Sequence, residues 1–151
     1  MALKVRFFEH SDAEGLLKMY RDVGSWFEDI EISPEFIRTS SERPDFRFIV
    51  AEDDGTLVGF IGALYYKAVG RAELGPIAVD EATRGVGIGA ALTERMLDFL
   101  QENGIKRVNA KVKAQNDKAL AFFLRGGFAY EAYLRDYTLK GEDVAQLVRH
   151  I

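Results

Sequence analysis

The 151-residue chain contains no cysteine, which excludes disulfides, thiolate nucleophiles and cysteine-ligated metal sites together. It has only two histidines, His10 and His150, so a histidine metal cluster is not expected and we expect no metal. A Ser-His-Asp triad would have to use one of these two residues. If the chain is an enzyme, its general base is therefore expected to be a carboxylate or water. The lack of cysteine also fits a reducing compartment, and we expect a cytoplasmic protein.

Long apolar runs are missing as well. No segment approaches the ~20 apolar residues that span a bilayer, and Met1–Arg6 lacks the apolar core of a signal peptide. A formal net charge of -4 makes the chain a poor general ligand for nucleic acid, because neutralising phosphates requires clustered lysine and arginine. We therefore expect neither a membrane nor a nucleic-acid partner.

The composition is that of an ordinary globular domain. Hydrophobic residues make up 48% of the chain and charged residues 29%, which provides enough apolar side chains for a core. No internal repeat, low-complexity tract or Pro/Gly/Ser-rich linker interrupts it. We therefore expect a single domain over residues 1–151.

The hydrophobic pattern predicts alternating strands and helices. Ser11 followed by Glu14 predicts the N-cap of a first helix, and Ser33-Pro34 predicts the start of a second. The expected elements are a strand at Leu3–Glu9, helices at Asp12–Val23 and from Pro34, strands at Phe46–Glu52, Thr56–Lys67 and Ala72–Val79, a helix at Gly87–Asn103, a strand at Ile105–Val112, a helix at Asn116–Arg125, and strands at Phe128–Leu139 and Val144–Ile151. The order β-α-α-β-β-β-α-β-α-β-β indicates an α/β (mixed α+β) fold, with helices on both faces of a central mixed sheet of about seven strands.

The loop between the third strand of the middle group and the long helix carries the clearest functional signal. Its sequence is Arg84-Gly85-Val86-Gly87-Ile88-Gly89-Ala90. Alternate glycines leave backbone amides exposed and allow a ligand to approach closely. Unpaired N–H groups and the dipole of the helix favour an anion there, and Arg84 can add a charge-assisted hydrogen bond to phosphate. The loop is therefore predicted to hold a pyrophosphate; a glycine-rich turn needed only for packing is the alternative.

Two other phosphate-binding motifs fit less well. Gly85–Ala90 matches the dinucleotide fingerprint G-x-G-x-x-A, but five residues separate it from Val79, where its strand is expected to end. The ribose-binding carboxylate of that fingerprint is also missing, because the next strand ends with Asn109–Lys113. The phosphate loop G-x-x-x-x-G-K-[ST] is absent.

At these residues the sequence resembles the GNAT superfamily of N-acetyltransferases. Leu74–Leu92 is similar to the acetyl-CoA motif of the family, in which a strand is followed by R/Q-x-x-G-x-G/A and a helix. A second stretch, with Asn116–Ala119, Phe122-Phe123 and Gly126–Phe128, is similar to its N-x-x-A…Y-x-x-x-G-F signature. The resemblance implies an enzyme that moves an acetyl group from acetyl-CoA to a primary amine by direct attack in a ternary complex. The acceptor would be a peptide or protein amine or a small-molecule amine, and a homodimer is compatible with this interpretation.

The resemblance also implies which residues bind the cofactor. The strand before the loop would pair with the pantetheine arm, the loop would hold the pyrophosphate, and the second helix would border the thioester. The implied residues are Ile77, Ala78, Val79, Arg84, Gly85, Val86, Gly87, Ile88, Gly89, Ala90, Asn116, Ala119, Phe122 and Phe123. Pro76 has no N–H to donate, and it is interpreted as the family's bulge, which separates two parallel strands; an edge position is the alternative.

The resemblance is less definite about the catalytic residues. Glu73 is implied as the general base, directly or through water, and the two-residue period of a strand puts it on the same face as Ile77. A solvated charge paired with Arg71 is the alternative, and the loop charges Asp80 and Glu81 are weaker candidates.

Phe123 stands where many relatives have a tyrosine that is thought to protonate the leaving thiolate. Water or another tyrosine would then serve. Tyr133 and Tyr137 are our candidates, with Tyr65, Tyr66 and Tyr130 left open. The segment Leu134–Asp143 is also faintly similar to enzymes that acetylate protein N-termini.

Two other classes of function remain possible at this point. A CoA-binding sensor without turnover would explain Phe123. A structural domain would need the glycine loop only for packing.

Overall fold

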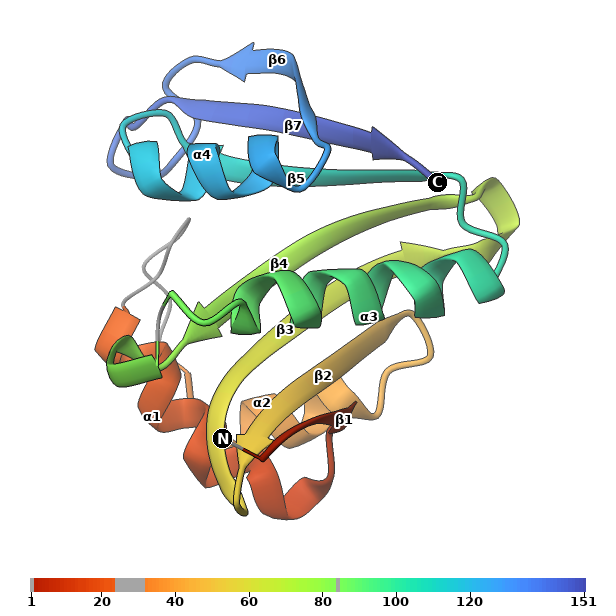
Figure 1. Cartoon of the computed structure of the whole chain (residues 1–151). Coiled ribbons are helices and arrows are strands. Elements are labelled where there is room, and N and C mark those ends of the chain that lie inside the picture. Colours follow the sequence, from red (N-terminus) through yellow and green to blue (C-terminus); the bar gives the residue numbers. More distant parts are fainter. Residues whose placement is uncertain (1, 24–31, 84) are drawn as a thin grey trace.

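The computed structural model describes residues 2–23, 32–83 and 85–151. In this part of the chain the strands form one sheet with the order β1-β2-β3-β4-β5-β7-β6 (Figure 1). The elements are β1 Leu3–Phe7, α1 Ala13–Val23, α2 Pro34–Ser41, β2 Phe46–Asp53, β3 Thr56–Tyr66, β4 Arg71–Val79, α3 Ile88–Glu102, β5 Arg107–Lys113, α4 Asp117–Arg125, β6 Ala129–Leu134 and β7 Val144–His150. Strands β4 and β5 pair parallel and the other neighbours antiparallel, so the predicted order and the mixed α/β fold are confirmed.

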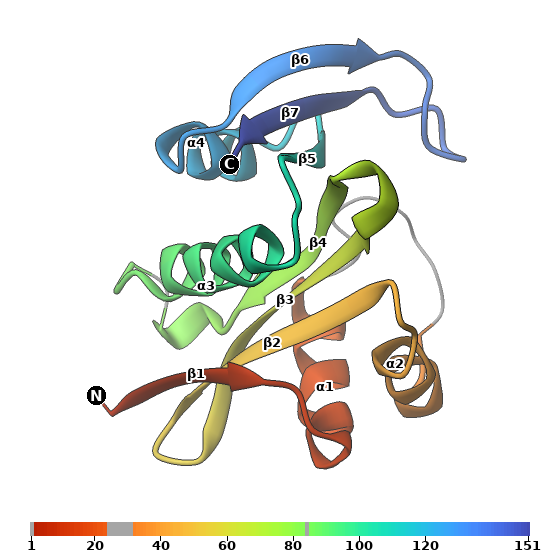
Figure 2. The same cartoon turned by 90° about the vertical axis from the view of Figure 1, so that its right-hand side faces the viewer.

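Helices cover both faces of the sheet, and each face has its own apolar core. Helix α3 lies on one face, and α1 and α2 lie on the other (Figure 2). From α3, Ile88, Leu92 and Met96 are buried in the larger core, as the helical spacing of these apolar residues predicted. On the opposite face, Leu16 of α1 is buried in the same core as Phe60 of β3. Both cores depend on side chains that alternate between the two faces of β3 and β4.

The predicted cap of the second helix is confirmed, and that of the first is wrong. Ser33 Oγ accepts a hydrogen bond from Phe36 N at 3.1 Å. Ser11 instead lies inside a 3-10 turn, His10–Asp12, and α1 begins at Ala13. Here the Asp12 carboxylate accepts from Glu9 N at 2.7 Å. The Asp12 carboxylate thus binds the amide that precedes the 3-10 turn, and this turn separates Ser11 from the start of α1.

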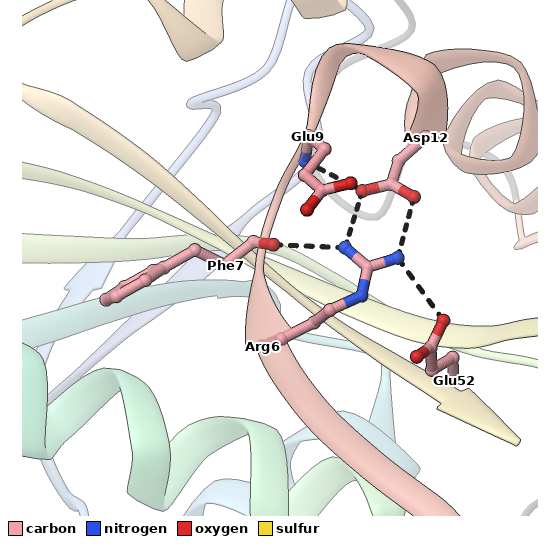
Figure 3. Close-up of polar contacts among 5 residues, drawn as sticks. All are labelled: Arg6, Phe7, Glu9, Asp12 and Glu52. Carbon is pink, nitrogen blue, oxygen red and sulfur yellow. Dashed lines mark hydrogen bonds and ion pairs between the residues drawn. The ribbon is translucent and has the colours of Figure 1, made fainter. Parts of the chain in front are cut away.

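Arg6 on β1 holds this carboxylate in place (Figure 3). Its Nη1 and Nη2 each lie 2.9 Å from an oxygen of Asp12, and Nη2 lies 3.3 Å from Glu52 Oε2 on β2. Burial alone would raise the pKa of Asp12, but the hydrogen bonds from Arg6 and from Glu9 N outweigh it, and the pKa is lowered. Because folding lowers this pKa, the ionised Asp12 stabilises the folded protein at pH values above its unfolded pKa of about 3.9. This stabilisation is lost as the pH falls through the lower pKa of the folded state.

Strand β4 contains the irregularity that opens the sheet. Ile61 pairs with Ile77 and Ala63 with Leu74, so Gly75 and Pro76 together face the single residue between Ile61 and Ala63. This is a bulge on the β3 side, as predicted for Pro76. On the β5 side Pro76 lies beyond the last paired residue of β4, so the edge alternative also describes its position. Pairing of β4 with β5 runs from Arg71 only as far as Leu74, and beyond it the two parallel strands separate.

The bulge also reverses the direction of the side chains. Leu74 belongs to the core under α3, so Glu73 points to the other face. Ile77 packs against the same core as Leu74, and Ala78 belongs to the core on the other face. The prediction that Glu73 and Ile77 share a face is therefore wrong, because the extra residue at Gly75–Pro76 shifts the two-residue period by one.

The last predicted strand but one is shorter than expected. Strand β6 ends at Leu134 instead of Leu139. Asp136 has a φ of 52°, in the left-handed region, and Tyr137 N donates to Glu142 O at 2.9 Å inside the turn that leads to β7. Tyr137 therefore lies in a loop, although the residue alternation predicted a strand position.

Candidate functional site

A pocket of about 710 Å³ lies between the end of β4, the start of α3 and helix α4. It opens where β4 and β5 separate, because the strands no longer fill that space with a shared ladder. Its walls are lined by Ile77, Ala78, Val79, Gly85, Gly87, Ile88, Gly89, Ala90, Thr93, Glu94, Asn116, Lys118, Ala119, Phe122, Phe123, Arg125, Gly126 and Phe128. Most of the predicted cofactor residues are in this set, so the fold brings together segments that lie far apart in the sequence.

One end of the pocket is the amino terminus of α3. Gly87 is the N-cap residue, with a φ of 83°, and no side-chain hydrogen bond caps the helix within the described residues. A Cβ at Gly85 or Gly87 would have nothing within 4 Å, so the backbone here borders open space. The first amides of a 15-residue helix and the positive end of its dipole therefore meet the pocket. This is an arrangement that binds anions such as phosphates.

The opposite wall packs closely against α3 and is apolar at Ala119, Phe122 and Phe123, with Lys118 and Arg125 also lining the pocket. A Cβ at Gly89 would lie 2.9 Å from Phe122 Cε1, so glycine at this position allows the close approach of α4. The ring of Phe122 meets that of Phe123 edge to face at 5.2 Å, and Phe123 is only 1% exposed. At the start of α4, Asn116 Oδ1 accepts from Ala119 N at 3.2 Å. The pocket thus combines a polar end with an apolar side, as a ligand with a charged and an apolar part requires.

A bridge of polar contacts connects the two walls. Arg149 of β7 donates from Nη1 to Glu94 Oε1 on α3 at 2.9 Å and to Gly126 O at the end of α4 at 2.8 Å. Glu94 and Gly126 both line the pocket. Through these two hydrogen bonds Arg149 links α3 to the end of α4, and it helps to set the distance between the two walls.

A second polar group lies on the other face of the sheet. Glu73 Oε1 and Lys111 Nζ are 2.9 Å apart, and their side chains are 35% and 20% exposed. Lys111 Nζ also lies 5.8 Å from the centre of the Tyr137 ring. Burial lowers the pKa of Lys111, but the hydrogen bond and charge of Glu73, together with Tyr137, outweigh it and raise the pKa. Glu73 therefore pairs with Lys111, and the alternative pairing with Arg71 is not the one observed.

The comparison with known proteins identifies the family. The model of the acetyltransferase (GNAT) family matches residues 13–128, well over half of the chain. This chain belongs to the GNAT acetyltransferase family. The GNAT resemblance of the acetyl-CoA motif and of the second motif is thereby confirmed, and both motifs line the pocket.

Individual GNAT relatives differ in what they acetylate. The chain is 35% identical over 112 residues to the N-alpha-acetyltransferase RimI of Mycobacterium tuberculosis, covering 70% of this chain and 67% of RimI. It is 28% identical over 146 residues to a mycothiol acetyltransferase of Beutenbergia cavernae, covering 92% of this chain but only 43% of that protein. The chain thus spans less than half the length of the mycothiol enzyme. Among solved structures, the putative acetyltransferase yncA of Salmonella typhimurium, which contains acetyl-CoA, superposes with a TM-score of 0.87 at 18% identity, over 99% of this chain and 94% of yncA.

The predicted GNAT cofactor residues fall into three groups. Most of them line the pocket. Val86 does not, and its side chain is 57% exposed. Arg84 lies outside the described residues, so its predicted contact with the pyrophosphate stays a prediction.

Six residues that line the pocket were not predicted from the sequence. Thr93 and Glu94 follow Gly89 and Ala90 by one helical turn, so the i, i+4 spacing on α3 could have indicated them. The other residues come from α4 and the turn after it: Lys118, Arg125, Gly126 and Phe128. Arg149 carried no local signal, because it reaches the site only through the pairing of β7 with β5.

The candidate tyrosines are not equivalent. Tyr133 donates its hydroxyl to Asp143 Oδ2 at 2.8 Å, and this hydrogen bond is the main reason why its pKa is raised. Tyr137 lies beside Lys111 and hence near Glu73. Neither tyrosine lines the pocket. Tyr65 is buried against Phe99, with ring centres 5.5 Å apart, which is a packing role.

The described residues contain neither a cluster of metal-ligating side chains nor a helix that could cross a membrane. No group of three or more histidine, aspartate or glutamate side chains in this part of the chain is arranged to hold a metal ion. None of its helices combines the length and the apolar character needed to cross a membrane.

Proposed function

We propose that this chain is an acetyl-CoA-dependent N-acetyltransferase. The observation that carries the proposal is the amino terminus of α3, which no described side chain caps and which opens into a pocket with apolar residues on its opposite wall. The helix amides suit the pyrophosphate of coenzyme A. Beyond Leu74, β4 is no longer paired with β5, so its backbone groups on that side can form hydrogen bonds with the amides of the pantetheine arm. Membership of the GNAT family and the acetyl-CoA in the yncA structure support the same donor.

The proposed reaction is direct attack of a primary amine on the thioester. The amine nitrogen bonds to the acetyl carbon, the carbon–sulfur bond breaks, and coenzyme A leaves. The chain has no cysteine, so no acyl-cysteine intermediate can form. The protein then contributes mainly positioning and polarisation of the carbonyl group.

Glu73 is the proposed general base, directly or through water. An ammonium group must lose a proton before its nitrogen can attack, and Glu73 lies on β4 at the point where the pairing with β5 ends. Phe123 cannot donate a proton to the leaving thiolate. Of the two candidate tyrosines, Tyr137 is the better proposal, because it lies beside Lys111 and hence near Glu73.

Replacing Glu73 by glutamine tests this assignment. We expect Glu73→Gln to lower kcat by about 10²-fold or more, the usual contribution of a general base, and to leave the affinity for acetyl-CoA unchanged. Glu131→Gln is the matched control, because Glu131 is also a glutamate on the sheet and pairs with Arg107. Turnover of Glu73→Gln equal to that of the wild type at every pH would remove Glu73 from the mechanism.

The acceptor is a primary amine of a peptide, a protein or a small molecule. RimI is named for α-amine acetylation and the mycothiol enzyme for a small-molecule product, so the relatives support both classes. A thiol-release assay with acetyl-CoA and a panel of amines of both kinds tests the proposal. Thiol release with at least one class is the expected result.

A CoA-binding sensor without turnover is the second candidate, and Phe123 in place of the family's tyrosine favours it. Such a protein would bind coenzyme A and raise its Tm accordingly, since a ligand that binds only the folded state stabilises it. It would release no thiol with any amine of the panel, and this result would decide against the enzyme.

A further inference from the structure

The ion pair between Glu73 and Lys111 lies on the face of the sheet opposite to α3 and the core beside the proposed acetyl-CoA pocket. Ala72 and Leu74 on β4 belong to the core on the pocket side, and so do Ala110 and Val112 on β5. Because side chains alternate along a strand, Glu73 and Lys111 both point to the opposite face. An acceptor that approaches the thioester from that face through the opening between the strands meets these two charges first.

The ion pair also lies at the place along β4 and β5 where an acceptor would enter. The last paired residues of β4 and β5 are Leu74 and Ala110, and Glu73 and Lys111 are their immediate neighbours in sequence. The two charges therefore bridge β4 and β5 at the point where the strands begin to separate. A group held by them lies at the inner end of the opening that leads to the pocket.

This ion pair is suited to exchange of partners. Glu73 is 35% exposed and Lys111 20% exposed, so a small ligand from solvent can reach both charges. Burial lowers the pKa of Lys111, but the hydrogen bond and charge of Glu73, together with Tyr137, outweigh burial and raise it. Lys111 therefore stays a cation at neutral pH and cannot act as a base. The neighbouring Lys113 has its own partner, with Nζ 3.3 Å from Glu142 Oε1.

The charge balance of the proposed reaction then restricts the acceptor. An acceptor ammonium that binds Glu73 displaces Lys111, and Glu73 becomes neutral when it takes up the proton of the amine. In both situations Lys111 would be a largely buried cation with Tyr137 beside it but no carboxylate partner, which is unfavourable. An acceptor that carries its own carboxylate close to the amine replaces that partner and keeps Lys111 paired throughout.

We propose that the acceptor is a free α-amino acid or a similarly compact amine with an adjacent carboxylate, whose ammonium group binds Glu73 and whose carboxylate binds Lys111. The proposal rests on the proposed acetyltransferase function and narrows it. The ammonium gives one proton to Glu73, and the freed nitrogen bonds to the acetyl carbon. The carbon–sulfur bond breaks, and the thiolate takes up the second proton that the nitrogen loses, directly or through water. Glu73 then returns its proton to the solvent, and the products are an N-acetyl amino acid and coenzyme A. Amino-acid amides, peptides and polyamines lack the adjacent carboxylate and are expected to be poorer acceptors.

The test compares each amino acid with its own carboxamide, for example L-alanine with L-alaninamide, across the common side chains, and includes spermidine. Initial rates of thiol release with acetyl-CoA give kcat/KM, and mass spectrometry identifies the product. We expect the best amino acid to exceed its amide by about tenfold or more, the usual effect of one charge-assisted hydrogen bond.

Two variants make the test specific for Lys111. Lys111→Met keeps the apolar stem, removes the charge and should bring the acid-to-amide ratio close to one. Lys113→Met is the matched control on the same strand and should keep the wild-type ratio. Wild-type protein that prefers amides, peptides or spermidine, or Lys111→Met with an unchanged ratio, would overturn the assignment.

The outcomes also separate this inference from the function on which it rests. Acetylation of amides and polyamines without a preference for acids contradicts the zwitterionic acceptor only. Binding of acetyl-CoA, measured as a rise in Tm, with no acetylation of any amine contradicts the acetyltransferase function and this inference with it.

Discussion

Replacing Gly87 by glutamate places a carboxylate at the amino terminus of α3. Gly87 has a φ of 83°, and a Cβ there has nothing within 4 Å, so the new side chain extends into the open space at the proposed pyrophosphate site. The backbone strain of a non-glycine residue in this conformation costs about 1 kcal/mol. The protein should therefore remain folded while its site changes.

The loss of affinity follows from the same geometry. A hydrogen bond between an amide and a charged group contributes about 1.5–3 kcal/mol, and the first turn of α3 offers several such amides. Loss of two of them costs about 3 kcal/mol or more, before repulsion between the carboxylate and the phosphates is added. We therefore expect acetyl-CoA to bind at least about 100-fold more weakly to Gly87→Glu.

Isothermal titration calorimetry with acetyl-CoA measures this change, and two further variants control for strain and charge. Gly87→Ala has the same backbone strain without the carboxylate and should lose much less affinity. Gly104→Glu introduces the same residue at a φ of 81°, again with no atom within 4 Å of the Cβ, just beyond the other end of α3. Gly104→Glu should bind acetyl-CoA like the wild type. Unchanged affinity of Gly87→Glu would refute the assignment of the helix terminus as the anion site.

Three further predictions concern the pocket walls and the network of Figure 3. Arg149→Met removes the bridge to Glu94, and it should raise the KM for acetyl-CoA severalfold while kcat changes little; a fall in kcat alone would contradict a role in pocket width. Gly89→Val should lower both Tm and acetyl-CoA affinity, because its Cβ would start 2.9 Å from Phe122; binding with wild-type affinity would contradict this close packing. Asp12→Asn should lower the free energy of unfolding by about 2 kcal/mol at neutral pH. Because the pKa of Asp12 is lowered in the folded state, the difference from the wild type should shrink as the pH falls below about 4, and a difference independent of pH in urea titrations would contradict it.

Local sequence determined the order of the elements and the glycine-rich loop before α3. The helical spacing of Ile88, Leu92 and Met96 sets the buried face of α3, and Ser33 caps α2 through a bond only three residues away. The glycines before α3 permit positive φ angles whatever surrounds them. Features of this kind depend on neighbours within one or two turns, so their signal is complete in a short stretch of chain.

Tertiary structure decided the features that depend on partners distant in sequence. The bulge at Gly75–Pro76 is defined only by the pairing of β4 with β3, and it put Glu73 on the face opposite to Ile77. Tyr137 left its predicted strand because the chain turns back to form β7 beside it.

The choice of partner for each charge was decided in the same way. Glu73 pairs with Lys111 because the parallel register of β4 and β5 brings them together, and Arg149 reaches Glu94 across 55 residues of sequence. Sequence spacing predicts which residues share an element, but a charged side chain finds its partner through the register of neighbouring strands. That register is fixed by the burial of both faces of the sheet at once, so it exists only in the folded chain.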